Sequence, residues 1–121
     1  MPIAKYQDEG SFITKTWALG HMRARKVVIK QGQKLEEAAV LGKVTADSKY
    51  IKSLKAATDG SEVPDAIATE AVDATAGDVE TIVFIAGEFD QDALVLGTGH
   101  TLGSVDAVFR TKSIWLVKPM G

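Results

Sequence analysis

The hydrophobic positions fall into short runs that turn residues separate. Val27 to Ile29 lie within the β-branched run KVVIK (26–30), and Gln31-Gly32-Gln33 follows as a turn. Residues 40–45, 50–55, 66–72, 93–96 and 114–118 have similar patterns, with Gly42 marking a bulge or a close backbone approach in the first of them. Residues 34–39 are too few for an independent helix and predict a connecting turn.

The most β-prone run is VETIVFIA at 79–86, which we expect to form the central strand, followed by an acidic loop at 88–92. Only one stretch has helical spacing. Leu102, Val105, Val108 and Phe109 recur on one face, and Thr101 or Ser104 is available as the cap. The pattern therefore predicts an all-β fold of the small barrel-like or sandwich-like kind, with one short helix.

The start of the chain lacks such a pattern. Tyr6, Phe12, Ile13, Trp17 and Leu19 are scattered among polar residues. Burying these five side chains returns less free energy than ordering about 15 residues costs. We expect residues 1–22 to form an arm that is flexible when free, and residues 23–121 to form a single β-rich domain. Trp17 has two interpretations: contact with a partner, or burial in its own domain.

Composition narrows the class. The 121 residues are 45% hydrophobic and 25% charged, as in ordinary globular domains. The absence of cysteine excludes disulfides and thiol chemistry. Charges at the start replace the apolar region of a signal peptide, and no apolar run is long enough to cross a membrane, so we expect a soluble protein without an export signal or membrane partner.

The charge is uneven along the chain. Residues 1–60 carry 11 Lys and Arg against 6 Asp and Glu, whereas residues 61–121 carry 3 against 10. No acid lies between Gly10 and Glu36, a segment with six cations: Lys15, Arg23, Arg25, Lys26, Lys30 and Lys34. This segment is either a surface for an acidic partner or nucleic acid, or an edge strand protected by lysine. In the nucleic-acid alternative, a small barrel binds single strands with Trp17 as the stacking platform.

Candidate chemistry is sparse. Gly97 to Ser104 lacks the glycine spacing of a dinucleotide site and the lysine of a P-loop. Glu88, Asp90 and Asp92 alternate like calcium ligands, but the turn glycine and the final glutamate of such a loop are missing. His21 and His100 are far apart in sequence. We expect no enzyme activity, no cofactor, no metal and no small-molecule substrate.

Several segments together resemble a known family. These are AAVLGKVT at 38–45, ATDGSEVPDAIATEAVDATAGD at 57–78, and the apolar strand, acidic loop and terminal IWLV that follow. Over roughly residues 25–118 they resemble the bacteriophage lambda head decoration proteins. The resemblance implies a β-clip or "β-tulip" domain with no catalytic residues.

It also implies a homotrimer at threefold positions of the expanded head, where it clamps and stabilises the major capsid protein. The protein would be in the host cytoplasm during assembly and then on the outer surface of the virion. The arm would order by joining a capsid strand. The expected contact residues are Tyr6, Phe12, Ile13, Trp17 and Leu19, with no direct contact to nucleic acid.

Overall fold

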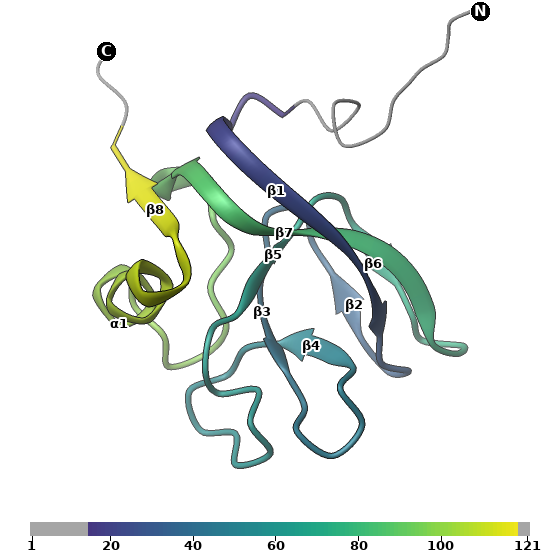
Figure 1. Cartoon of the computed structure of the whole chain (residues 1–121). Coiled ribbons are helices and arrows are strands. Elements are labelled where there is room, and N and C mark those ends of the chain that lie inside the picture. The colour runs from purple at the N-terminus through teal and green to yellow at the C-terminus, as the bar shows by residue number, and fades with distance from the viewer. Residues whose placement is uncertain (1–14, 119–121) are drawn as a thin grey trace, which may run out of the picture.

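The structure is a computed structural model that describes residues 15–118. The strands are β1 (Ala18–Ile29), β2 (Lys34–Leu35), β3 (Val40–Lys43), β4 (Tyr50–Lys52), β5 (Ala66–Ala68), β6 (Val72–Asp73), β7 (Val79–Asp90) and β8 (Ile114–Val117); the α-helix is α1 (Leu102–Phe109). The expected fold class, mostly strand with one short helix, is confirmed for this part of the chain (Figure 1).

The main sheet closes on itself. Its strand order is β1-β4-β3-β5-β7-β8, and β7 also pairs with β1, so five strands form a ring. The sixth strand, β8, lies outside the ring and pairs with the C-terminal end of β7. The pairing of β1 with β7 is antiparallel and runs from Ala18↔Phe89 to Ile29↔Val79. By contrast, β1 meets β4 at a single pair, Ile29↔Tyr50. β2 and β6 form a separate two-stranded sheet.

β7 is the central strand, as predicted, but it is longer than the sequence indicated. It continues through Gly87 to Asp90 and pairs there with β8 from Ile114 to Val117. The expected acidic loop at 88–92 is therefore wrong for its first three residues. Polar side chains are tolerated in this extension because Glu88 and Asp90 alternate with the buried Phe89 and point to the opposite face.

Two further boundaries differ from expectation. β1 begins at Ala18, because the extension of β7 supplies a partner for it, so the predicted boundary after residue 22 lies inside a strand. The predicted strand at 93–96 is reduced to one isolated bridge between Val95 and Ala39. Regular strand pairing ends at Asp90, where the 3-10 turn at Gln91–Ala93 begins.

Two hydrophobic clusters hold the fold together. The inner cluster lies within the ring and is built mainly from small aliphatic residues of the strands, such as Leu41, Ala66 and Val83. The outer cluster lies between the ring and α1 and contains the large aromatic residues Phe84, Phe89 and Phe109. Val83 and Phe84 are adjacent and both buried, because β7 has one cluster on each face.

Local sequence explains two features of the remaining fold. Thr101 caps α1: its side chain accepts from Ser104 N, and the Ser104 hydroxyl accepts from Thr101 N, a capping box. Gly42 marks a close approach, as predicted, since a Cβ there would lie 2.0 Å from the carbonyl oxygen of Ser61. Both features fix the loops that surround the ring.

Candidate docking surface

Trp17, one of the five expected contact residues, lies in the core of the domain. It is only 7% exposed and packs edge-on against Phe84, with ring centroids 5.6 Å apart, and against Phe89. Its indole Nε1 donates a hydrogen bond of 2.7 Å to Glu37 Oε2. This bond, and secondarily Lys15, lowers the pKa of Glu37. Trp17 is therefore an anchor that holds the start of the described chain to the outer cluster, and the structure favours burial in its own domain over a partner contact.

The other four candidates are divided between the two parts of the chain. Leu19 lies in β1 and is 44% exposed, so it is available to a partner. Tyr6, Phe12 and Ile13 lie outside the described residues. The structure therefore separates Trp17 from Leu19 although only one residue lies between them.

Beside Leu19, β1 contains a bulge. Between the pairs Gly20↔Glu88 and Arg23↔Ala86, β1 has two intervening residues and β7 has one. His21 adopts a left-handed φ of 53°, and Gly87 has a φ of 136°. A Cβ on Gly87 would lie 2.9 Å from Met22 Cα, so the bulge requires glycine at this position.

Around this bulge lies an exposed surface that we call the terminal face: His21, Arg23, Glu88, Trp115 and Val117. Trp115 is 46% exposed and Val117 37% exposed, since Ile114 and Leu116 point to the outer cluster instead. A hollow of about 270 Å³ runs between Trp115 and the bulge. Phe89 pairs with both Ala18 and Leu116, so this face lies where β1 begins and β8 ends (Figure 1).

The basic segment does not form one continuous patch of free charge. Lys15, Lys26 and Lys30 form ion pairs with Glu37, Glu80 and Asp47 respectively. Within residues 15–118, Arg23 and Arg25 have no salt-bridge partner. The nucleic-acid alternative relied on Trp17 as a stacking platform, and the burial of Trp17 removes that support.

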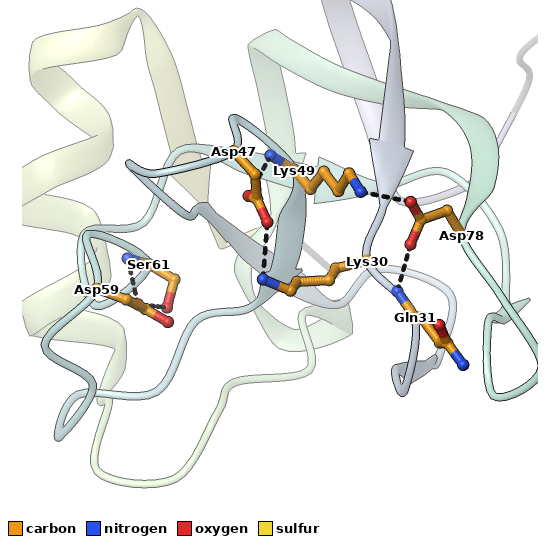
Figure 2. A network of polar contacts seen from close by, with 7 residues as sticks. All are labelled: Lys30, Gln31, Asp47, Lys49, Asp59, Ser61 and Asp78. Atoms are coloured by element: carbon orange, nitrogen blue, oxygen red, sulfur yellow. Dashed lines mark hydrogen bonds and ion pairs between the residues drawn. The ribbon is translucent and has the colours of Figure 1, made fainter.

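Ion pairs instead fix the end of the ring where β1 and β4 meet (Figure 2). Lys30 Nζ lies 2.7 Å from Asp47 Oδ2, and Lys49 Nζ lies 2.6 Å from Asp78 Oδ2. Asp78 also accepts from the backbone N–H of Gln31. The bond from Lys30 lowers the pKa of Asp47, and the bond from Lys49 lowers that of Asp78. These contacts join the end of β1, the β3–β4 turn and the start of β7.

The remaining candidates for chemistry have structural roles. A Cβ at Gly97 would lie 1.9 Å from the Ser53 carbonyl oxygen, so backbone packing accounts for this glycine. His100 contacts the hydroxyls of Ser53 and Ser104 and the carbonyl of Glu62, and thereby joins a loop to the start of α1.

Within residues 15–118, no group of three or more His, Cys, Asp and Glu side chains is arranged to hold a metal ion. Asp90 caps the 3-10 turn by accepting from Asp92 N. None of the helices in this part of the chain is long and apolar enough to cross a membrane.

A ring-like sheet, a helix that covers one side of it and an exposed face beside the start of the first strand define a small β-rich interaction module. The chain matches the sequence model of the family described as bacteriophage lambda head decoration protein D over residues 10–112. It therefore belongs to that family, and its role is decoration of the phage capsid. No curated individual protein matched the chain.

Proposed function

We propose that this protein is a homotrimeric cement protein that binds the outside of the expanded phage head at threefold positions and stabilises the lattice of the major capsid protein. The observation that carries the proposal is the family match over residues 10–112, which covers nearly all of the described body. Its action is mechanical rather than catalytic. The protein is in the host cytoplasm during assembly and acts on the outer surface of the virion.

The arm supplies the first contact. Tyr6, Phe12 and Ile13 precede Trp17, which is fixed in the outer cluster by two aromatic contacts and a hydrogen bond. A pull on the arm is therefore transmitted to the core of the domain rather than to a loop. Such a segment gains main-chain hydrogen bonds when it is laid against a capsid strand.

The terminal face supplies the second contact. Trp115 and Val117 of this face, and Leu19 beside it, are exposed at the end of the sheet where β1 begins. An arm that reaches the capsid brings this end of the body to the capsid surface. Three arms and three faces in one trimer act together, because each contact raises the effective concentration of the next.

Removal of residues 1–14 tests the role of the arm. The deletion stops before Lys15, since a longer one would remove Trp17 and destabilise the outer cluster. We expect the truncated protein to sediment as a trimer with an unchanged thermal midpoint, and to bind expanded heads about 100-fold more weakly than the full chain.

A full-length variant provides the matched control. Tyr6→Ser, Phe12→Ser and Ile13→Ser together should reproduce the effect of the deletion, whereas Lys5→Ser and Gln7→Ser should retain full binding. Equal binding by the truncated and full-length proteins would show that the arm is dispensable. A protein that stays monomeric and does not bind expanded heads would overturn the proposed function altogether.

A further inference from the structure

One edge of β1 is open. Among residues 15–118, β7 pairs along one side of β1, and the other side meets only Tyr50 of β4, at Ile29. Residues 24–28 therefore have no strand on that side. Their pairing with β7 is regular, without a register shift from Ala24 to Ile29.

The backbone of Lys26 is directed at this open side. Lys26 lies opposite Ile82, whose carbonyl accepts from Thr69 Oγ1 and so points away from β1. Directly opposed residues of an antiparallel pair turn their backbone groups the same way, either both toward each other or both away. The N–H of Lys30, four residues on, donates to Tyr50 O on the same side. The N–H and C=O of Lys26 therefore face the open edge.

A hollow of about 410 Å³ adjoins the edge. It lies between residues 25–28 of β1 and the hairpin from Lys43 to Tyr50. Val27 and Tyr50 are buried and supply apolar surface to it, and the ion pairs of Figure 2 fix two of its lining residues, Asp47 and Lys49. The hollow is thus a fixed gap in the ring, beside backbone groups that have no strand partner.

The charge around the hollow is positive. Arg25, Lys26, Lys43 and Lys49 line it, against one acid, Asp47. Asp47 is paired with Lys30, and Lys49 with Asp78. Arg25 and Lys43 have no salt bridge within the described part of the chain, and Lys26 lies 3.6 Å from Glu80 with both side chains mostly exposed.

We propose that the open edge of β1 binds an extended acidic polypeptide segment, which adds as a strand at residues 24–28 and places its carboxylates against Arg25, Lys26 and Lys43. The identification of its source rests on the proposed function: the segment belongs to the capsid subunit. Main-chain hydrogen bonds at an open edge provide affinity, and the neighbouring charges select the sequence.

A lysine on an open edge also protects against non-specific strand pairing. The two roles are compatible, because a cationic edge excludes neutral and basic strands and accepts an acidic one. Nucleic acid shares the negative charge, but it lacks the strand backbone that Lys26 N–H and C=O require.

The first experiment uses fluorescently labelled peptides of about ten residues and the full-length protein. A peptide that alternates Glu and Val should bind, with an affinity that falls as salt rises. The peptide that alternates Lys and Val should not bind, and neither should the Glu-Val peptide N-methylated at alternate residues. Absence of Glu-Val binding, or equal binding after N-methylation on either register, would overturn strand addition.

The second experiment separates backbone from charge in the protein. Lys26→Pro removes the N–H that faces the open edge, a change that edge strands tolerate, and Lys26→Ala keeps it. We expect Lys26→Pro to bind the Glu-Val peptide about tenfold more weakly than Lys26→Ala. Equal binding by the two would overturn the proposed pairing. Should Lys26→Pro not fold, as judged by thermal unfolding, the charge variants below decide the matter.

Arg25→Glu with Lys43→Glu should weaken both peptide and head binding about tenfold. The matched control is Lys34→Glu with Lys55→Glu, two cations outside the hollow, which should bind as the parent does. Loss of the trimer in the Arg25/Lys43 variant would assign the edge to a second copy. If the parent and the control bind single-stranded DNA and the Arg25/Lys43 variant does not, the edge is assigned to nucleic acid. Either result overturns the proposal.

The proposed function fails separately from this inference. If the parent protein does not bind heads, the proposed function is wrong, while the peptide result still decides whether the edge accepts an acidic strand. If the parent binds heads and the Arg25/Lys43 variant binds them equally well, the open edge has no part in capsid binding and the inference is wrong.

Discussion

The two tryptophans lie at the same end of the sheet in opposite environments. Trp17 is 7% exposed and Trp115 is 46% exposed. Their backbones nevertheless lie beside residues of β7 that are only two positions apart, since Trp17 O accepts from Asp90 N and Trp115 pairs with Glu88. Trp17 stands outside any apolar run and Trp115 stands inside one. Sequence context alone would therefore rank them in the wrong order, because burial depends on which face of β7 each side chain meets.

This contrast has a clear thermodynamic consequence. We expect Trp17→Ala to lower the free energy of unfolding by about 3–5 kcal/mol, since it leaves a cavity beside Phe84 and Phe89. Chemical denaturation of the full chain measures the change. A loss below about 1 kcal/mol would show that the outer cluster does not depend on the anchor.

The bulge beside Trp115 depends on one glycine. Gly87→Ala should cost about 1–3 kcal/mol, because a left-handed backbone and the approach of Met22 both oppose a side chain there. Gly77→Ala is the matched control, since a Cβ at Gly77 meets nothing within 4 Å, and should change stability by less than about 0.5 kcal/mol. Similar effects at both positions would contradict a strained bulge.

Trp17→Phe isolates the hydrogen bond to Glu37. This variant keeps most of the aromatic packing, so its loss of stability should be smaller than that of Trp17→Ala. The loss should depend on pH. The folded-state pKa of Glu37 is lowered mainly by Trp17, so the bond contributes above the unfolded pKa of about 4.3 and its contribution disappears as pH falls through the folded value.

Unfolding of the parent and of Trp17→Phe from pH 7 to pH 3 measures this dependence. The difference between the two proteins should narrow below about pH 4. A constant difference across the range would show that Glu37 is not the group responsible.

Trp115→Ala should have the smallest effect on stability, about 0.5 kcal/mol or less, because nearly half of the side chain is already exposed. The same variant should weaken binding to expanded heads if the terminal face contacts the capsid. Ile82→Ala removes a similarly exposed side chain from the same sheet, outside the terminal face, and should bind heads normally. Equal head binding by both variants would exclude Trp115 from the contact.

The parts of the fold that sequence predicted are those with a local physical cause. Thr101 and Ser104 cap α1 because both partners of the capping box lie within one turn. The run at 79–86 forms the centre of the sheet because its residues favour strands. The close approach at Gly42 follows from a glycine inside a β-prone run, where a side chain would be expected.

The docking surface was predicted less well, for a reason visible in three residues. Leu19 was predicted to contact the capsid from a flexible arm, but it is part of β1, whose start depends on pairing with Phe89 some 70 positions away. Trp115 lies in an entirely apolar segment, IWLV, in which alternation cannot indicate the outward face. The basic segment was recognised as either a binding surface or a protected edge, and the structure places part of it on an open edge.

The sequence by itself determined the class of fold, the helix and its cap, the central strand and, through its resemblance to the head decoration proteins, the family. These properties depend on local propensity and on patterns a few residues long. Only the tertiary structure decided that Trp17 is an anchor, that Trp115 is exposed and that β1 has an open basic edge. Each of these depends on which distant residue of β7 or β4 lies opposite, and strand register is fixed by the packing of the whole sheet rather than by its neighbours in sequence.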